Sequence, residues 1–332
     1  MKNDSNARTS LSIGIEIGGT KTQVGIGSSE DGLLPGGIVR KQVQREKGAD
    51  GILGDIIALV DEVLDSRNLT LSDVARIGIG YGGILDASRG VILKSFQIDG
   101  WTDFPLRDWA QRRWGKPVCI ENDASTAGLA EYMLGSGRGC SRLFYITVGS
   151  GVGGGWIVNG KIDSGQGLGA AEIGHTWVPN PQTGEPMELE QVCSGWGIGQ
   201  RAREAARAER TLMEQLAGSI DAIDAKIVYA AAEQGDEIAR RIIRETCQTL
   251  ALGISNVVAL LHPERVVIGG GVSLMGPLFW DELRSQFQAR VLSTFASRVE
   301  LLPAKLQENV VVIGALCLGQ LGENGTEFIQ PL

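Results

Sequence analysis

Two glycine-rich turns are the first features of the sequence with an evident chemical use. Gly18, Gly19, Thr20 and Lys21 lie between apolar stretches with strand character, 11–18 and 21–29. Successive backbone N–H groups in such a turn form a nest for an anion, and glycine allows a phosphate to approach the backbone closely. Thr20 adds a hydroxyl and Lys21 a positive charge, so the turn predicts a phosphate site. The alternative is an ordinary hairpin with a solvated lysine.

The second turn follows the apolar stretch 143–148. Gly149, Gly151 and Gly154 match G-x-G-x-x-G, which is typical of dinucleotide binding when a helix comes next. Here the following stretch, WIVNGKI, has strand character, which disfavours a nicotinamide oxidoreductase. The Walker motif GxxxxGK[ST] and the HRD and DFG motifs of protein kinases are absent from the sequence. This turn therefore indicates a second phosphate cradle between two strands.

The elements that must position these turns alternate between strands and helices, so the predicted fold class is α/β. Apolar spacing predicts helices over 50–66, 105–115, 124–134, 196–217, 221–234, 236–261, 277–292 and 308–321, with strands near 77–81, 116–121, 265–271 and 299–303. Residues 13–27 and 144–158 share one plan, a strand, a glycine-rich turn and a second strand. This echo favours two related domains over a chance recurrence of a common hairpin.

Composition excludes several classes of protein. The 31 basic and 39 acidic residues give a net charge of −8, which argues against a general nucleic-acid or anionic-membrane surface. Five scattered cysteines without a CxxC pair indicate a reduced compartment. Neither an apolar leader nor a membrane-length apolar stretch is present. We therefore expect a cytoplasmic protein.

Five motifs, in order, resemble the ROK family of bacterial sugar kinases and repressors within the actin-like ATPase fold. They are IGIEIGGTK (13–21), IENDASTAGLAE (120–131), ITVGSGVGGG (146–155), GLGAAEIGH (167–175) and VVIGGGVS (266–273). The resemblance implies two actin-like ATPase (ribonuclease H-like) α/β domains around a central cleft. It implies a small domain at 11–121 plus 308–332 and a large domain at 122–307, while the polar residues 1–10 predict a disordered tail.

The resemblance implies an ATP-dependent hexose kinase. The expected reaction is the conversion of glucose to glucose 6-phosphate. Asp123 is implied as the catalytic base that accepts the proton of the sugar 6-hydroxyl, a role that an ionised carboxylate of ordinary pKa can fill. The alternative is that Asp123 only caps the helix starting at Ala124. The implied substrate-binding residues are Gly83, Asn122, Asp123, Glu172, His175 and Glu190.

ATP and Mg²⁺ are the implied cofactors. The resemblance places the ATP phosphates and adenosine on backbone-exposing positions: Gly18, Gly19, Thr20, Lys21, Thr147, Gly149, Ser150, Gly151, Gly269, Gly270 and Gly271. Glu16 stands where many relatives carry Asp near the magnesium. Its extra methylene is a departure, so direct contact and contact through a water are both left open.

A second departure concerns zinc. Many members of the family carry three cysteines after the EIGH motif that complete a zinc cluster with the histidine, and the matching positions here are Pro181, Thr183 and Glu188. Proline offers no side-chain donor and threonine is a poor ligand, whereas a structural zinc needs four donors. The sequence therefore predicts no structural zinc.

Several functions remain as alternatives. Kinases for N-acetylglucosamine, N-acetylmannosamine, mannose, fructose or allose share these motifs, and polyphosphate as donor is disfavoured because no basic groove is evident. A ROK-type repressor would carry a helix-turn-helix domain before the first motif, where only about 12 residues stand. A non-enzymatic sugar sensor is opposed by the presence of Asp123 and both turns. The expected partners are a hexose, ATP and a second copy of the chain, without nucleic acid or membrane.

Glycine is unusually frequent, with 47 of 332 residues, about twice the ordinary ~7%. The windows 14–27, 78–83, 149–174 and 269–271 hold 22 of them. We expect these windows to mark the places where backbone lies against ATP or sugar.

Overall fold

A computed structural model describes residues 10–95 and 98–318. Apart from Ser10, the predicted tail at 1–10 lies outside these residues. Within them the chain forms two compact units. The first comprises residues up to Ser141, Gly155–Ala170 and the residues from Glu308, and the second comprises Arg142–Gly154 and Ala171–Gln307. These units are groups of residues in contact, and they do not test the domain boundary predicted between residues 121 and 122. That boundary stays a prediction.

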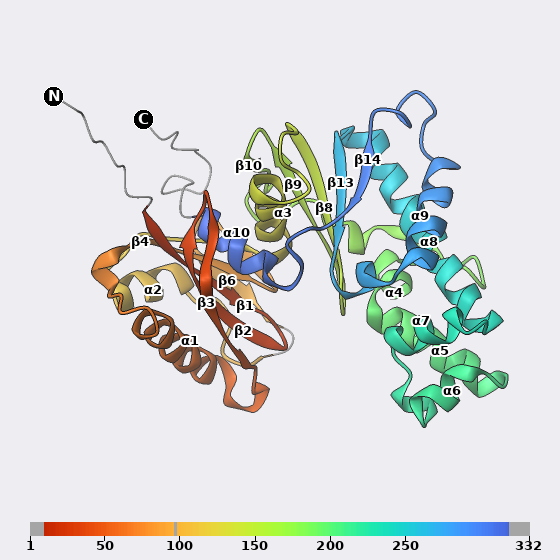
Figure 1. Cartoon of the computed structure of the whole chain (residues 1–332), viewed down its shortest axis with the longest axis horizontal. Coiled ribbons are helices and arrows are strands. Elements are labelled where there is room, and N and C mark those ends of the chain that lie inside the picture. The colour runs from red at the N-terminus through yellow and green to blue at the C-terminus, as the bar shows by residue number, and fades with distance from the viewer. Residues whose placement is uncertain (1–9, 96–97, 319–332) are drawn as a thin grey trace. The chain divides into compact units, whose positions relative to one another are not determined.

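The first unit is built on a five-stranded sheet with the order β3-β2-β1-β4-β7. β1 is antiparallel to β2 and parallel to β4, which is in turn parallel to β7. The elements of this unit (Figure 1) are β1 (Leu11–Ile17), β2 (Lys21–Ser28), β3 (Gly32–Gln42), α1 (Gly48–Asp65), β4 (Val74–Tyr81), β5 (Ile84–Asp86), β6 (Val91–Lys94), α2 (Leu106–Trp114), β7 (Val118–Asn122), α3 (Asp123–Leu134) and α10 (Val310–Leu318).

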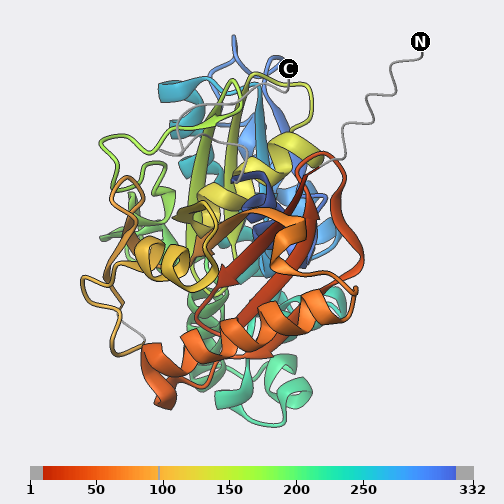
Figure 2. The same cartoon turned by 90° about the vertical axis from the view of Figure 1, so that its left-hand side faces the viewer.

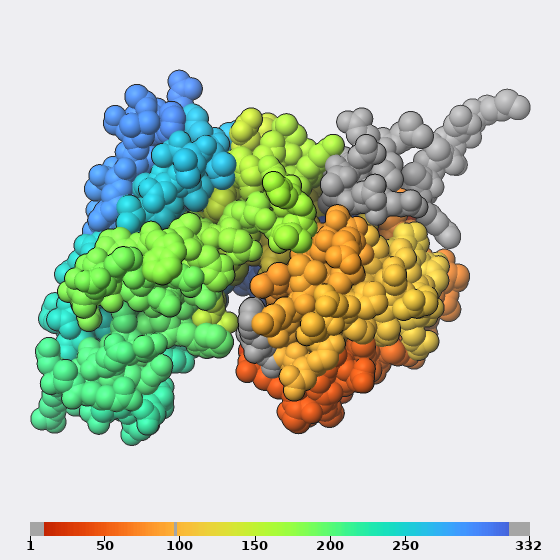
Figure 3. Space-filling model, turned by 180° about the vertical axis from the view of Figure 1, so that it is seen from behind, coloured from red at the N-terminus to blue at the C-terminus, as the bar shows by residue number. Residues whose placement is uncertain are grey.

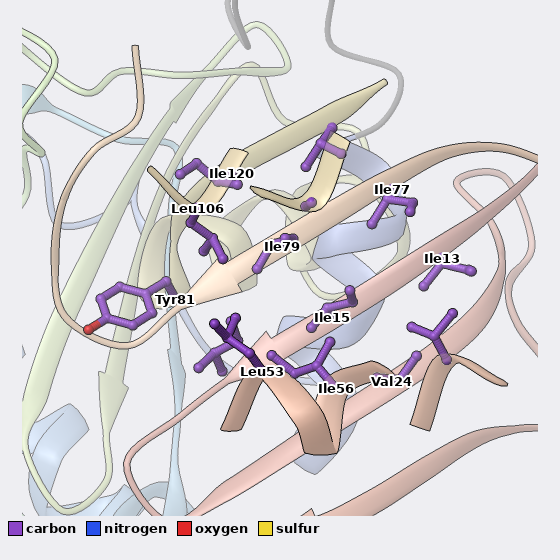
Figure 4. Close-up of a cluster of buried hydrophobic side chains, with 14 of the residues drawn as sticks. Ile13, Ile15, Val24, Leu53, Ile56, Ile77, Ile79, Tyr81, Leu106 and Ile120 are labelled. Carbon is purple, nitrogen blue, oxygen red and sulfur yellow. The ribbon is translucent and has the colours of Figure 1, made fainter. Parts of the chain in front are cut away.

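One face of this sheet carries the apolar core of the unit. Side chains alternate between the two faces of a strand, so the isoleucines of β1 and β4 all point to the side that α1 and α2 cover. Each fully buried isoleucine stabilises the fold by about 1.5–3 kcal/mol. Figure 4 shows this cluster, which includes Ile13, Ile15, Val24, Leu53, Ile56, Ile77, Ile79, Leu106 and Ile120.

The other face of the same strands carries glycine, and helix α10 lies against it, on the side opposite α1 (Figure 2). A Cβ atom at Gly14 would overlap the carbonyl oxygen of Val312, and one at Gly78 would overlap that of Ala315. Glycine thus lets helix backbone approach strand backbone.

This packing corrects the expectation that the glycines of 14–27 and 78–83 lie against ATP or sugar. Gly14, Gly25, Gly78 and Gly80 instead accommodate α10, and only the turn glycines 18, 19, 82 and 83 remain beside a hollow in this unit. The physical reason is the pleat, because alternate strand residues face a helix rather than the end of the sheet.

Helix α3 packs on α10 in the same way. A Cβ atom at Gly314 of α10 would overlap the carbonyl oxygen of Thr126 in α3. The sheet, α10 and α3 therefore form consecutive layers held by close backbone contacts, which fix where α3 begins.

The second sheet has the order β10-β9-β8-β13-β14, with β8, β13 and β14 mutually parallel. The remaining elements are β8 (Arg142–Val148), β9 (Val152–Val158), β10 (Lys161–Ile162), β11 (Trp177–Pro179), β12 (Pro186–Glu188), α4 (Leu189–Cys193), α5 (Gly195–Ala208), α6 (Leu212–Ala217), α7 (Ala225–Glu233), α8 (Glu237–Leu261), β13 (Arg265–Gly269), α9 (Pro277–Gln288) and β14 (Glu300–Pro303). Helices α5 to α7 form part of the green surface of the second unit in Figure 3.

The two five-stranded sheets share one topology. Numbered along the chain within each sheet, both have the order third, second, first, fourth, fifth, and each contains a first strand followed by a glycine-rich turn. This repetition agrees with the predicted α/β fold of two related actin-like halves. Among the described residues no helix combines the length and apolar character needed to cross a membrane.

Several elements differ from the sequence-based expectation, among them β3, the turn before β9 and α6. Strand β3 lies where the apolar pattern predicts nothing, because Pro35 and the two glycines after it interrupt the alternation. The predicted loop 149–155 is shorter, since β9 begins at Val152. The predicted helix 196–217 is two helices, because the Thr211 hydroxyl accepts from Met213 N at 3.2 Å and caps a new one.

We predict that Gly78→Ala lowers the free energy of unfolding by about 1–3 kcal/mol, because the new methyl group must push α10 away from β4. Urea unfolding measures this change. Gly54→Ala is the matched control, since its site is an exposed position of α1 with no atom within 4 Å of the added Cβ. That control gains about 0.5–1 kcal/mol. Equal loss in both variants would contradict the close approach of α10.

Candidate active site

The turn between β1 and β2 presents the backbone of the first predicted phosphate site. Gly18 N donates to Lys21 O at 3.1 Å, and Thr20 O accepts from Val43 N at 2.9 Å. The Lys21 ammonium donates to Glu308 O at 3.3 Å. The Arg45 guanidinium, which the sequence analysis did not consider, donates to Gly19 O at 3.4 Å. Two cationic side chains therefore lie beside this turn, as a phosphate site requires.

Glu16 points into the first unit beside this turn and is buried. Its Oε2 accepts from Gln23 Nε2 at 2.6 Å, across the β1–β2 pair. Burial raises the pKa of Glu16, while Lys21, the Gln23 hydrogen bond and Arg40 lower it. A single carboxylate fits Mg²⁺ only together with substrate phosphates and waters. The described residues hold no group of three metal-ligating side chains.

Asn122 and Asp123 stand at the junction of β7 and α3. Asn122 Oδ1 accepts from Ala124 N at 2.9 Å and from Ser125 N at 3.2 Å, so Asn122 is the N-cap of the helix. Helix α3 begins at Asp123, one residue earlier than predicted, and the capping role considered for Asp123 belongs chiefly to its neighbour. The Asp123 carboxylate also accepts from Ala124 N, at 2.8 Å. Its anion is favoured at a helix N-terminus.

Gly82 and Gly83 follow β4 directly and lie beside Asp123. Gly82 N donates to Ile17 O at 2.9 Å, and a Cβ atom at Gly82 would lie 3.0 Å from Asp123 Oδ2. A hollow of about 90 Å³ opens here, lined among others by Gly18, Gly19, Gly82 and Gly83. In this unit the structure therefore brings the predicted Gly83 and the first phosphate turn to one hollow.

Glu121 is a functional candidate that the sequence analysis missed, although it precedes Asn122 in a quoted motif. It is buried, its Oε1 accepts from Asn122 N at 2.8 Å, and its Oε2 accepts from Ser164 Oγ at 3.2 Å. Burial raises its pKa, opposed by these two hydrogen bonds. Glu121 thereby holds the end of β7 to the start of the loop that follows β10.

The second phosphate turn, between β8 and β9, lies in the second unit. Gly149 N donates to Gly151 O at 2.9 Å, and Gly149 O accepts from Gly195 N, the first residue of α5, at 2.7 Å. A Cβ atom at Gly149 would meet nothing within 4 Å, so this side of the turn is open. The turn therefore offers room for a ligand; Ser150 lies in the turn, and Thr147 lies near the end of β8 before it.

Gly269, Gly270 and Gly271 follow β13 in the same unit. Gly270 has a φ of 84°, and a Cβ atom there would lie 2.5 Å from the Val148 carbonyl group. Only glycine fits this position without strain. A Cβ at Gly271 would meet nothing within 4 Å. The glycines thus join the end of β13 closely to the end of β8 and leave one open face.

The predicted sugar ligands Glu172, His175 and Glu190 gather in the second unit. Glu190 Oε2 accepts from Val152 N at 2.7 Å and would lie 2.5 Å from a Cβ at Gly151, which explains glycine there. Burial raises the pKa of Glu172, which the charge of His175 lowers and that of Glu190 raises. These three side chains are therefore electrostatic neighbours.

A buried arginine supports α4, the short helix that carries Glu190. Arg201 of α5 donates to Val192 O at 3.0 Å, to Glu245 Oε2 at 2.9 Å and to Thr246 Oγ1 at 2.5 Å. Burial lowers the pKa of Arg201, and Glu245 opposes that shift. This network links α4, α5 and α8, and it thereby fixes the backbone of the helix from which the Glu190 side chain extends.

The residues at the three zinc-ligand positions do not fit a zinc ion. Pro181 and Thr183 lie in the turn between β11 and β12, where Asn180 Oδ1 accepts from Thr183 N at 3.3 Å. The Glu188 carboxylate lies 3.4 Å from His175 Nδ1. The predicted lack of a structural zinc rests on these donor types and stays a prediction.

The structure thus gathers the predicted residues into two groups, one in each unit. The first unit holds Glu16, the turn 18–21, Gly83, Asn122 and Asp123, and the second holds Thr147, the turn 149–151, Glu172, His175, Glu190 and residues 269–271.

Comparison with known proteins shows the family of this chain. The pattern described as the ROK family matches residues 12–321. A glucokinase of Thermotoga maritima is 32% identical over 308 residues, covering 91% of this chain and 95% of that protein. A glucokinase of Halalkalibacterium halodurans is 33% identical over 327 residues, covering 95% and 96%. The chain belongs to the ROK family.

A solved structure extends the likeness to three dimensions. The ROK family glucokinase from Streptomyces griseus, in complex with glucose and AMPPNP, is 33% identical, has a TM-score of 0.79, and covers 94% of this chain and 100% of its own. The expected ROK resemblance and the two-domain actin-like α/β fold are confirmed.

The burial of Glu121 predicts a pH-dependent cost to stability. At low pH its carboxyl is protonated in both states. As pH rises the unfolded chain ionises first, because the folded pKa is raised, and stability is lost until the folded pKa is passed. Glu121→Gln keeps an acceptor for Asn122 N and removes this loss.

Thermal midpoints measured from about pH 4 to about pH 8 check this expectation. The advantage of Glu121→Gln over the wild type should grow with pH. Glu185→Gln, at an exposed carboxylate, is the control for the loss of one negative charge. If the difference in thermal midpoint between Glu121→Gln and the wild type shrinks as the pH rises, the prediction is wrong.

Proposed function

We propose that this ROK protein is a hexokinase that transfers the γ-phosphoryl group of ATP to the 6-hydroxyl of glucose. Glucokinase relatives at about 30% identity over nearly the whole chain support a sugar kinase, and the similar structure with glucose and AMPPNP supports both substrates. The observation that carries the assignment is the Asp123 carboxylate, which lies at the N-terminus of α3 beside Gly82 and shares its unit with the first phosphate turn.

In the proposed mechanism Asp123 accepts a hydrogen bond from the 6-hydroxyl and takes its proton as the phosphorus–oxygen bond forms. Phosphoryl transfer depends more on an oriented hydroxyl than on a strong base, so an ionised carboxylate suffices. Because Asn122 Oδ1 is engaged by the helix, its amide Nδ2 is the group that donates to the sugar. Glu172, His175 and Glu190 bind the remaining hydroxyls.

The backbone amides of the turns 18–21 and 149–151 receive the ATP phosphates, with Lys21 adding positive charge. The open faces of Gly149 and Gly271 leave room for the nucleotide. Glu16 is the residue that would hold a Mg²⁺ ion together with the ATP phosphates, and such an ion would supply positive charge against the phosphates. Expulsion of water when the substrates are enclosed prevents ATP hydrolysis.

Further parts of the proposal extend beyond the site. We assign the small domain to 11–121 plus 308–332 and the large domain to 122–307, and we expect a homodimer that works in the cytoplasm, where ATP and hexoses meet. The runner-up function is the same reaction on another hexose or an N-acetylhexosamine, because kinases for those sugars share the motifs of this chain.

We predict that Asp123→Asn lowers kcat by about 10²–10⁴-fold, the usual contribution of a general base, while glucose binding remains. Asparagine keeps the acceptor for Ala124 N and fits beside Gly82. A coupled ADP-release assay on glucose, mannose, fructose, allose and N-acetylhexosamines measures turnover, and calorimetry measures binding.

The wild type should have its highest kcat/KM with glucose. Asp50→Asn, at an exposed position of α1, is the control and should match the wild type. Full turnover by Asp123→Asn would remove Asp123 from the mechanism, and a higher kcat/KM for another sugar would replace glucose as the substrate.

A further inference from the structure

Glu188 is a charged residue that the proposed mechanism does not use, and it contacts one that the mechanism does. Its Oε1 lies 3.4 Å from His175 Nδ1. The His175 side chain is 60% exposed and that of Glu188 is 34% exposed. Packing therefore restrains the imidazole ring only weakly, and the carboxylate is placed to restrain it instead.

The backbone fixes this contact. His175 ends a short 3₁₀ helix, Ile173–His175, and β11 begins two residues later. Trp177 of β11 pairs with Glu188 of β12, and Leu189 N donates to Thr176 O at 2.9 Å. Buried Val178 and Leu189 anchor the two sides of the hairpin. The histidine, just before β11, and the glutamate, at the end of β12, are thus brought together at the open end of one hairpin.

The other carboxylates near His175 are occupied differently. Glu190 Oε2 accepts from Val152 N, and Glu172 precedes the 3₁₀ helix, where burial raises its pKa. Neither has a carboxylate oxygen within 4 Å of an imidazole nitrogen, whereas Glu188 Oε1 lies 3.4 Å from Nδ1. Among the three acidic side chains in this part of the second unit, Glu188 is therefore the one that contacts Nδ1.

We propose that Glu188 is a positioning residue for sugar binding: its carboxylate accepts the Nδ1–H of His175, which leaves Nε2 as the nitrogen that meets a sugar hydroxyl. A neutral imidazole has one donor and one acceptor nitrogen, and the partner of one nitrogen fixes the tautomer and the ring plane. This inference rests on the proposed function, because it takes His175 as a sugar ligand.

The loop between β11 and β12 contains no cysteine, and its own backbone holds it closed. Asn180 N donates to Glu185 O at 2.7 Å, and Gly184 N donates to Asn180 O at 2.9 Å, so backbone hydrogen bonds close the hairpin. Glu188 stands where many relatives carry a zinc-binding cysteine. In this chain its carboxylate contacts the histidine without a metal between them.

Steady-state kinetics with glucose test the proposal. Glu188→Ala should raise the KM for glucose by about 10-fold, the lower end of losses seen when a partner behind a ligand is removed. The kcat and the KM for ATP should stay within about twofold, because the reacting atoms are untouched. Glu188→Gln keeps an oxygen acceptor for Nδ1–H and should restore most of the affinity. Glu185→Gln, in the same hairpin, is the matched control and should equal the wild type.

A double-mutant cycle separates positioning from a purely structural role. His175→Ala alone should raise the glucose KM, and adding Glu188→Ala to it should change KM by no more than about twofold, because the two act as a unit. A full additional loss in the His175→Ala background would overturn the inference, as would an unchanged KM in Glu188→Ala. A lowered thermal midpoint identifies a variant whose hairpin is damaged. If Glu188→Ala is damaged in this way, the glucose KM of Glu188→Gln is used in its place.

Two further outcomes have distinct meanings. A wild type without glucose turnover would overturn the proposed function and this inference with it. Turnover that depends on His175 but not on Glu188 would overturn only the positioning role. One zinc ion per chain by elemental analysis of the wild type would also overturn it, because a metal would then occupy the imidazole.

Discussion

The close approach of helix α10 to the glycine face of the first sheet is the constraint on which the rest of the first unit depends. Isoleucines on one face of β1 and β4 build the core, and glycines on the other face let the helix backbone lie directly on the strands. Gly314 then lets α3 lie equally close to α10. Since helices in such contact cannot shift without overlap, the N-terminus of α3, and with it Asp123, has one position relative to the first phosphate turn.

The first unit also buries two carboxylates, those of Glu16 and Glu121, which is costly for stability. Burial raises the pKa of Glu16, Glu121 and Glu172. The first two accept hydrogen bonds from an amide side chain, a backbone amide or a hydroxyl, which lowers part of the cost. Charged groups that destabilise the folded state are expected where a protein must bind polar ligands.

Much of the fold could be predicted from the sequence, because apolar alternation and glycine-rich turns are local signals. The two hairpins and the helices α1, α8 and α9 are examples. The role of Gly78 could not be predicted, since its partner Ala315 lies more than 200 residues away in the chain and only packing brings the two together. The roles of Glu121 and Glu188 were missed for the same reason, because their partners Ser164 and His175 are set by strand ends and a hairpin register that no periodicity encodes.

The position of the transferred phosphate tests the central claim most directly. The account predicts that glucose incubated with ATP, Mg²⁺ and the wild-type protein yields a single phosphate ester at carbon 6, seen as a phosphorus–carbon-6 coupling by nuclear magnetic resonance, with one ADP formed per ester. An ester at another carbon would show that Asp123 does not face the 6-hydroxyl. Formation of ADP without any ester, or of neither product, would contradict a glucose kinase.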